Sequence, residues 1–298
     1  MYVNLRESSS FVSSVVAILG AGALVLGIVG CAGASGAASD DGSDSPASIT
    51  AVSGADSSVS PVPTGTGFDY QLGGAYDAPD GVGVVARDRS AAPLEDGYSI
   101  CYVNAFQTQP GDTKLWKSSL LLKKNGNPVT DPDWPDEILL DTSTASKRAD
   151  IVKVLTPWIK GCARSGYAAV EFDNLDSYTR SGKALKYEHN AALAKSLVEV
   201  SHESGLAAAQ KNVAERSTQL KRSAGFDLVV AEECAANEEC AQYSSAYGTQ
   251  VVDVEYTDNL PTSFSEMCKK HGAPELMILR DRDLLTPDED GYVYEPCN

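Results

Sequence analysis

The chain has 298 residues and carries 24 Lys and Arg against 41 Asp and Glu, so its formal net charge at pH 7 is −17. A chain this acidic is repelled by nucleic-acid phosphates and by anionic membrane surfaces, which excludes both as expected partners. Its length suits one large domain or two small ones. The charge is compatible with a cationic partner, and we expect the protein to be a monomer.

The first 30 residues have the features of a signal peptide. Residues 11–30 are an almost uncharged run of Val, Ala, Leu, Ile and Gly, as in the apolar core of a secretory signal. Cys31 follows directly and resembles the lipidated cysteine of bacterial lipoproteins. The alternative is an uncleaved membrane anchor, because about 20 apolar residues can span a bilayer. Both interpretations place the remainder outside the cytoplasm, either anchored to the membrane as a lipoprotein or secreted.

Residues 32–67 are rich in Ser, Ala, Gly and Asp and poor in large apolar side chains. Such a segment buries too little surface to offset its conformational entropy, so we expect a flexible linker. The folded domain is then expected over residues 68–298.

Six cysteines remain once Cys31 is set aside, an even number that suits disulfides in an oxidising compartment. Sequence alone does not fix their connectivity. Close spacing favours Cys234–Cys240, Cys268–Cys297 would hold the C-terminus, and Cys101–Cys162 would be left. There is no CxxC pair, and the three histidines are scattered along the chain. We therefore expect no metal site.

From residue 81 onward, short β-rich runs alternate with helical patterns. In 149–166 the apolar residues recur every three or four positions, which predicts a helix with one buried stripe. Similar patterns follow in 186–205, 213–225 and 263–272. The predicted strands are 81–88, 98–106, 137–143, 167–174, 206–212, 226–233, 251–258 and 276–283. Eight strands with intervening helices predict a single-domain (β/α)₈ TIM barrel, with an open doubly wound sheet as the alternative.

All eight predicted strands end in polar or ionisable side chains, whereas their interiors are Val, Ile, Leu and Ala. In a parallel barrel the active site lies at the carboxyl ends of the strands. One or two such ends would be ordinary helix caps, but eight predict a polar pocket. The end residues are Asp88, Asn104, Asp141, Asp173, Lys211 with Asn212, Glu232 with Glu233, Glu255, and Arg280 with Asp281.

The run AAVEFDNLDSY over 168–178 is the most informative of these ends. Strand alternation places Glu171 and Asp173 on one face, and buried charge is costly unless it is paired or used. A helix cap with a salt bridge is the alternative interpretation. Because each interior layer of a barrel comes from alternate strands, the fourth and sixth strands place Asp173 and one glutamate of the Glu232–Glu233 pair at similar height.

Two facing carboxylates indicate glycoside hydrolysis, in which one acid protonates the leaving oxygen and the other attacks the sugar or activates water. Other chemistries lack their motifs. There is no GxSxG and no P-loop, and the glycines of 81–86 lie inside a strand instead of at a strand-to-helix turn. No cofactor is expected. Five aromatic residues near strand ends are candidate stacking faces for sugar rings: Tyr76, Tyr102, Trp134, Tyr178 and Tyr256.

Several motifs resemble glycoside hydrolase family 114, the endo-α-1,4-polygalactosaminidases. They are QLGGAY, CYVNAF, DTS, EFDNLDSY, QKN, the AEEC…C pattern and VEYTDN, in this order from about Phe68 to the C-terminus. The resemblance implies a TIM barrel without a metal that hydrolyses galactosamine-containing α-1,4-linked polysaccharide. It also implies Asp173 and Glu232 as catalytic carboxylates. The sequence departs from the family at Arg87-Asp88-Arg89, where an apolar residue often follows the Asp.

We expect Asp173 to be the nucleophile and Glu232 the acid/base, with swapped roles or an inverting pair as alternatives. An acidic cleft would attract a polysaccharide bearing free amines. The rival functions are a carbohydrate-binding barrel without activity, a hydrolase of another amino sugar or α-linked polymer, and a scaffold whose strand-end charges form internal salt bridges. Residues expected to hold substrate or tune the acids are Asp88, Asn104, Asp141, Glu171, Asp176, Tyr178, Lys211, Asn212, Glu233 and Glu255.

Overall fold

The computed structural model describes residues 59–297. The predicted signal peptide, the lipidation site at Cys31 and most of the predicted linker lie outside the described residues and stay predictions. One nine-stranded sheet dominates the described part, with strand order β1-β2-β3-β6-β7-β8-β9-β10-β11. Its strands are β1 Gly67–Gln71, β2 Val82–Asp88, β3 Tyr98–Asn104, β6 Ala169–Asp173, β7 Ala207–Lys211, β8 Leu228–Glu232, β9 Val251–Tyr256, β10 Leu276–Arg280 and β11 Tyr294–Pro296.

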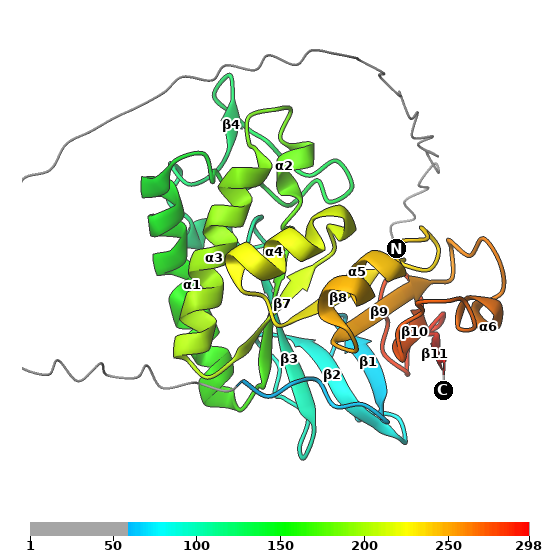
Figure 1. Cartoon of the computed structure of the whole chain (residues 1–298). Coiled ribbons are helices and arrows are strands. Elements are labelled where there is room, and N and C mark those ends of the chain that lie inside the picture. The colour runs from blue at the N-terminus through cyan, green and yellow to red at the C-terminus, as the bar shows by residue number, and fades with distance from the viewer. Residues whose placement is uncertain (1–58, 298) are drawn as a thin grey trace, which may run out of the picture. The chain divides into compact units, whose positions relative to one another are not determined.

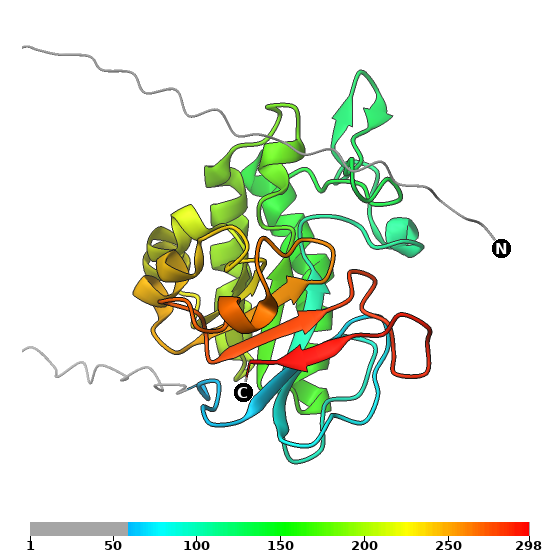
Figure 2. The ribbon, with the colours of Figure 1, turned by 90° about the vertical axis from the view of Figure 1, so that its right-hand side faces the viewer.

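The sheet curls into a nearly closed barrel. Every neighbouring pair from β1 to β10 is parallel, and only β11 runs antiparallel, against β10. Figure 2 shows β11, in red, beside β10 and close to the blue strand β1. The buried side chain of Arg280 on β10 joins the two ends of the sheet, because its Nη1 lies 3.0 Å from Asp69 Oδ1 on β1. The predicted barrel is therefore confirmed, and the open doubly wound sheet is wrong.

Helices cover the outer face of the later strands (Figure 1). Between β1 and β2, and between β2 and β3, the described chain forms loops without a helix. None of the helices within residues 59–297 is both long enough and apolar enough to cross a membrane. The helices are α1 Ala145–Ser165, α2 Ser177–Arg180, α3 Tyr187–Glu203, α4 Ser217–Ala224, α5 Cys240–Tyr247 and α6 Phe264–Met267, with short 3₁₀ turns at Asp112–Leu115 and Ala214–Arg216 and a hairpin of β4 Lys123–Lys124 and β5 Asn127–Pro128.

Among the parallel barrel strands, one predicted strand is wrong and one strand was not predicted. Residues 137–143 form only isolated antiparallel bridges, for example between Leu121 and Leu140, within the long connection from β3 to α1. The missing eighth parallel strand is β1, Gly67–Gln71, which the sequence analysis assigned to the linker and the domain start. Because one strand is lost and one is gained before β6, β6 and β8 remain the fourth and sixth barrel strands.

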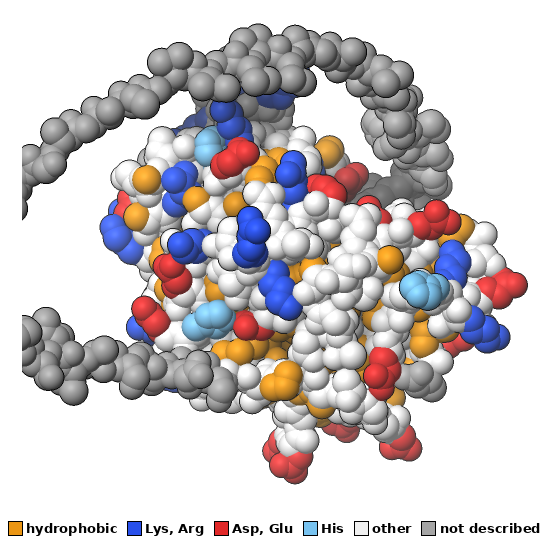
Figure 3. Space-filling model, viewed as in Figure 1, with side chains coloured by type: hydrophobic (Ala, Val, Ile, Leu, Met, Phe, Trp, Pro, Cys, Tyr) orange, Lys and Arg blue, Asp and Glu red, His pale blue; other side chains and the backbone are white. Residues whose placement is uncertain are grey.

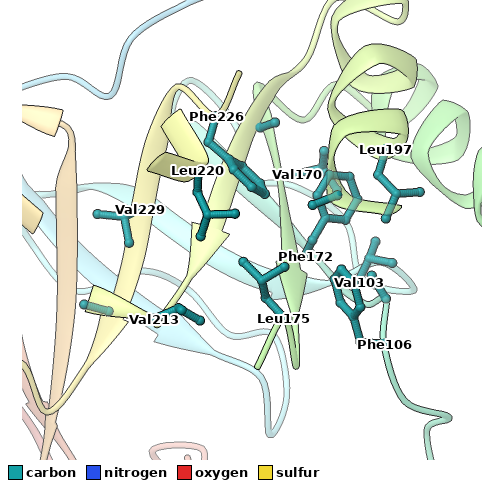
Figure 4. Packing of buried hydrophobic residues seen from close by; sticks show 14 of the residues in the cluster. Val103, Phe106, Val170, Phe172, Leu175, Leu197, Val213, Leu220, Phe226 and Val229 are labelled. Carbon is teal, nitrogen blue, oxygen red and sulfur yellow. The ribbon is translucent and has the colours of Figure 1, made fainter. Parts of the chain in front are cut away.

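Two layers of apolar side chains follow from strand alternation. One fills the barrel, with side chains such as Phe68, Ile100 and Val230. The other lies between the sheet and the helices, where Phe172 and Leu197 pack together. Figure 4 shows this second layer, with Val103 of β3, Phe172 of β6 and Val229 of β8 among the side chains that face the helices. Fully burying side chains of this size contributes about 1.5–3 kcal/mol each.

The chain just before β1 packs on the barrel. Val62 is buried, and its N–H donates to the side-chain oxygen of Gln250 at 2.7 Å. The folded domain therefore begins several residues earlier than the predicted start at Phe68.

Charged side chains of both signs are interspersed over the helical face (Figure 3). The acidic excess of the chain is thus not spread as one uniform field over this face. Three disulfides form with the expected pairing, Cys101–Cys162, Cys234–Cys240 and Cys268–Cys297, and they fit an oxidising compartment.

The two disulfides that close the longest and shortest loops should differ in their effect on stability. Replacing both Cys101 and Cys162, which are 61 residues apart, with Ala should lower the free energy of unfolding by about 4 kcal/mol. The same change at Cys234 and Cys240, 6 residues apart, should cost only about 2 kcal/mol. Urea unfolding of both double variants measures the difference, and the reverse order would contradict this account.

Candidate active site

The barrel interior changes from apolar to polar toward the carboxyl ends of the strands. On β6 the inward positions are Ala169, Glu171 and Asp173, and on β8 they are Leu228, Val230 and Glu232. On β7 two alanines are followed by Lys211. Alternation on several neighbouring strands thus brings acids and one base to the same end of the barrel.

The ammonium group of Lys211 lies at the centre of this end and is buried, with 2% of its side chain exposed. Its Nζ is 3.3 Å from Glu232 Oε2, 3.6 Å from Asp173 Oδ1 and 3.2 Å from Glu171 Oε1. It also donates to the Tyr70 hydroxyl at 2.9 Å. Burial lowers the pKa of Lys211, but Asp173 and Glu232 outweigh it, so the pKa lies well above its usual value and the group stays charged.

Asp173 is held by donors on both oxygens. Its Oδ2 accepts from the Tyr102 hydroxyl at 2.6 Å, and its Oδ1 accepts from the Asn174 backbone N–H at 2.6 Å. The Lys211 ammonium adds a third partner. Two hydrogen bonds and one ion-pair contact thus give this carboxylate one defined orientation.

Glu232 faces the same ammonium from β8. Its Oε1 accepts from the Tyr256 hydroxyl at 2.5 Å, and its Oε2 accepts from the Asn212 side-chain amide at 3.0 Å. Burial raises the pKa of Glu232, but Lys211 and these hydrogen bonds outweigh it, so the pKa lies below its usual value. Because both nearest oxygens contact one nitrogen, the Asp173 and Glu232 carboxylates lie at most about 7 Å apart, within the range of glycosidase pairs.

Three phenols complete the polar end of the barrel. Tyr70, Tyr102 and Tyr256 each donate to one of the carboxylates. Burial is the main cause that raises the pKa of each phenol well above its usual value. They therefore remain neutral donors across the working pH range. Tyr102 and Tyr256 thus serve the acids with their hydroxyls, although the sequence suggested them as stacking faces.

The backbone turns sharply directly after β6, β7 and β8, the strands that supply the two acids and the lysine. Asn174, Asn212 and Glu233 have φ of 62°, 50° and 58°, and Val213 has φ of 66°. Left-handed backbone is uncommon for residues other than glycine and most unfavourable for a β-branched one. Such strain concentrates at functional sites.

A cavity of about 530 Å³ opens above the carboxylates. Two further cavities adjoin it. One of about 330 Å³ shares Asp176, Asn212 and Glu232 with it, and one of about 550 Å³ shares Asp88 and Gln109. The lining residues show that the three form one groove across the end of the barrel. Acidic residues of the central cavity are Asp88, Asp131, Asp133, Glu137, Asp173, Asp176, Glu232 and Asp283, against Arg180, Lys211 and Arg282 as its bases.

Most of the predicted site residues lie together. Asp88, Asp176 and Asn212 line the central cavity with the two catalytic candidates, and Tyr178 and Glu233 line its neighbour. Asn104 is buried and accepts from the Asn174 side chain at 3.0 Å, so it supports the loop after β6.

Besides Asn104, three predicted residues do not reach the groove. Asp141 binds Lys147 and Ser143 at the start of α1, because residues 137–143 are not a barrel strand. Glu255 faces away from the interior and accepts from the Ala235 backbone N–H at 2.6 Å, since alternation on β9 turns Tyr256 inward instead. Glu171 points inward but is fully buried beneath the pair.

Sequence reasoning missed several residues of the site. Tyr70 was missed because β1 was not predicted, although Phe68 and Tyr70 alternate as a strand requires. Arg180 binds Asp131 at 2.7 Å, and Arg282 binds Glu233 at 2.6 Å. Arg180 lies beyond the end of β6 and Arg282 beyond the end of β10. The sequence analysis considered only the polar residues at strand ends, so it did not select them.

One cluster among residues 59–297 has the atom types of a metal site: Cys234, Cys240 and Asp253. Its two cysteines are joined in a disulfide, so their sulfurs are not available as thiolate ligands.

A parallel barrel with two carboxylates across a groove at its carboxyl-terminal end is an arrangement that glycoside hydrolysis can use. Residues 49–298 match the model of glycoside-hydrolase family GH114. The chain belongs to this family. No curated protein matches the sequence.

Solved structures support the same fold. Ega3 of Aspergillus fumigatus, solved in complex with galactosamine, shares 20% sequence identity at a TM-score of 0.64, covering 78% of this chain and 95% of that one. A variant of the glycoside hydrolase domain of PelA from Pseudomonas aeruginosa shares 16% identity at a TM-score of 0.50, covering 74% and 96%. At these identities the likeness shows the barrel fold.

Removing the shared ammonium should destabilise the domain in a pH-dependent way. Lys211→Met leaves one buried and two partly buried carboxylates without their cation, at a cost of about 3–5 kcal/mol. Their pKa values in the folded state rise, so the loss should be larger at pH 8 than at pH 5, where the acids can take up protons.

Thermal unfolding at both pH values measures this effect. Lys195→Met is the matched control, because Lys195 is exposed on α3 and its loss should change the melting temperature little. An equal, pH-independent effect of the two substitutions would show that Lys211 does not hold the carboxylates.

Proposed function

We propose that this enzyme hydrolyses α-1,4-linked, galactosamine-containing polysaccharide with Asp173 as nucleophile and Glu232 as acid/base. The observation that carries this proposal is that both carboxylates contact the same buried ammonium at the floor of an open groove. In this proposal the two carboxylates supply both the acid and the nucleophile, so neither a metal nor a cofactor takes part.

The contacts of Asp173 suit a nucleophile. Two hydrogen bonds, from the Tyr102 hydroxyl and the Asn174 N–H, and the nearby Lys211 ammonium fix its direction before substrate binds. Attack at the anomeric carbon forms a glycosyl ester, while Glu232 gives its proton to the leaving oxygen. Glu232 then takes a proton from the water that cleaves the ester. The bound of about 7 Å on the distance between the nearest oxygens of the two carboxylates is compatible with a retaining pair, which needs ~5–5.5 Å, and also reaches the short end of the inverting range at ~6.5 Å.

Glu232 must be protonated before the first step, although its pKa is lowered in the empty site. About a quarter of its side chain is exposed, 27%. A sugar seated above it excludes the remaining water, which strengthens the effect of burial and favours the protonated form. Substrate binding thus prepares the acid.

The groove suits an internal stretch of a cationic polymer. It continues past the catalytic pair on both sides, which fits an endo-acting enzyme. The cavity beyond Glu232 is lined by the further acids Glu215 and Glu239 and, among the described residues, by no Lys or Arg. Free amines of galactosamine would be attracted to these carboxylates, and the exposed ring of Trp134 lies at the central cavity as a stacking face.

Asp173→Asn and Glu232→Gln should each lower kcat at least about 1,000-fold, because each removes one of the two groups that act in the covalent step. Their melting temperatures should stay near that of the wild type. The assay measures new reducing ends from partly deacetylated polygalactosamine. The matched control is Glu233→Gln, since Glu233 contacts Arg282 and Asn259 instead of Lys211, and it should keep most of kcat.

Azide separates the two catalytic roles. With an activated substrate, azide should restore turnover of Asp173→Ala and of Glu232→Ala through opposite faces of the sugar, giving glycosyl azides of opposite anomeric configuration. The product of Asp173→Ala should carry the inverted configuration. Full activity of either amide variant, or the reverse pattern of anomers, would refute the assignment.

Substrate charge should govern binding. The fully N-acetylated polymer carries no amines and should be cut at least about tenfold less efficiently, as judged by kcat/KM, because it gains nothing from the acidic groove.

For the deacetylated polymer, salt should raise KM with little change in kcat. Glu215→Gln should raise KM several-fold, whereas Glu199→Gln, on the exposed face of α3, should not. Equal cleavage of both polymers would contradict the proposed substrate class.

A further inference from the structure

A third carboxylate, that of Glu171, lies beneath the catalytic pair and has no part in the steps above. Glu171 is fully buried on β6, two residues before Asp173 and on the same inward face. Its Oε1 accepts from the Tyr70 hydroxyl at 2.9 Å and lies 3.2 Å from Lys211 Nζ. Its Oε2 is buried and has no hydrogen-bond partner among the described residues.

We propose that Glu171 is a positioning residue that holds the Lys211 ammonium between Asp173 and Glu232 throughout the reaction. The inference rests on the proposed function and adds to it a group that does not touch substrate. It replaces the expectation that Glu171 binds substrate, because the groove above does not reach this side chain.

The partners of Lys211 divide into a fully buried pair below it, Tyr70 and Glu171, and two partly exposed carboxylates above it. An ammonium has three N–H donors, and here four oxygens surround it. The two nearest belong to Tyr70 at 2.9 Å and Glu171 at 3.2 Å, while Glu232 and Asp173 follow at 3.3 Å and 3.6 Å. The Tyr70 hydroxyl accepts a hydrogen bond from Lys211 and donates its own to Glu171. The lysine is thus fixed from the side opposite to the substrate.

A fixed Lys211 ammonium is useful in the proposed reaction because the negative charge moves between the two carboxylates. In the first step Asp173 loses its negative charge as the ester forms, and Glu232 gains one as it gives up its proton. The charge therefore moves from one side of Lys211 to the other while the total is unchanged. An ammonium fixed from below stabilises both arrangements without reorganising, which is the condition for effective electrostatic catalysis.

Glu171 also affects the protonation of the pair above it. Burial raises the pKa of Glu171 to about 7, with Lys211 opposing and Asp173 adding to this shift. Near neutral pH its charge therefore varies, and the charged form competes for Lys211 and raises the pKa of nearby carboxyls. Neighbouring Ala209, level with Glu171 on β7, leaves room for the side chain. The titratable groups that face it are Tyr70 on β1, Tyr102 on β3, Asp173 on β6, Lys211 on β7 and Glu232 on β8.

The test is the pH dependence of kcat for Glu171→Gln. Its basic limb reports the acid that must be protonated, here Glu232. The substituted amide is isosteric with the carboxylate but carries no negative charge, so the pKa of Glu232 should fall and the basic limb should move to lower pH by about one unit.

Tyr70→Phe provides a second test, because Tyr70 is the other residue that contacts Lys211 from below. Without the Tyr70 hydrogen bond Glu171 ionises less readily, so the limb should move in the same direction by a smaller amount.

Asp253→Asn is the matched control. Asp253 is likewise a buried carboxyl, but it lies on β9, faces away from the barrel interior and accepts from the Cys234 backbone N–H at 3.2 Å. Burial and Glu255 raise its pKa well above the usual value, so the amide replaces a largely neutral group and the limb should not move. Melting temperatures of all three variants separate loss of fold from loss of positioning.

An unmoved basic limb in folded Glu171→Gln and Tyr70→Phe would overturn the inference. Loss of activity as complete as in Asp173→Asn would overturn it too, because Glu171 would then act directly in the reaction. Either result leaves the proposed function standing, because that function is tested separately by the activity of Asp173→Asn and Glu232→Gln.

Discussion

One buried ammonium surrounded by three carboxylates is the interaction on which the active end of this barrel depends. Removing a charge from water costs several kcal/mol, and only close opposite charges and hydrogen bonds offset that cost. Lys211 meets this condition with Glu171, Asp173 and Glu232, and the carboxylates meet it with Lys211 and three phenols. Neither the acids nor the base would be stable at this depth alone.

The rest of the fold brings these groups to one height. Asp173 and Glu232 are the last residues of β6 and β8, above inward-facing residues that are mostly apolar, so they lie at the same end of the barrel. Left-handed residues directly after β6, β7 and β8 change the direction of the chain there. Arg280 joins the first and last parallel strands, which fixes Tyr70 relative to Lys211 on the opposite wall. Ion pairs at the rim, such as those of Arg180 and Arg282, neutralise some of the strand-end acids. The scaffold interpretation thus describes part of the rim, but not the open groove above the catalytic pair.

The sequence predicted the parts of this arrangement that follow from periodicity. Alternation on β6 and β8 identified Asp173 and the Glu232–Glu233 pair, and the resemblance chose Glu232. The predictions from sequence failed where contacts between distant parts of the chain determine the position of a residue. The run 137–143 has strand composition but lies in a long connection, so Asp141 binds Lys147 and Ser143 instead of lining the groove. On β9 the choice of inward residue depends on register, which placed Tyr256 and not Glu255 inside. Burial depth is also not encoded locally, so Glu171 could not be distinguished from a substrate ligand.

The most direct test of the assignment of Asp173 as nucleophile and Glu232 as acid/base is to trap the covalent intermediate. A glycosyl fluoride of galactosamine can load the Glu232→Ala variant, because fluoride leaves without acid assistance and loss of the base slows hydrolysis of the ester. Peptide mapping by mass spectrometry should then find the sugar on the peptide that contains Asp173. A sugar attached to any other carboxylate, or no adduct together with a product of inverted configuration, would contradict the account.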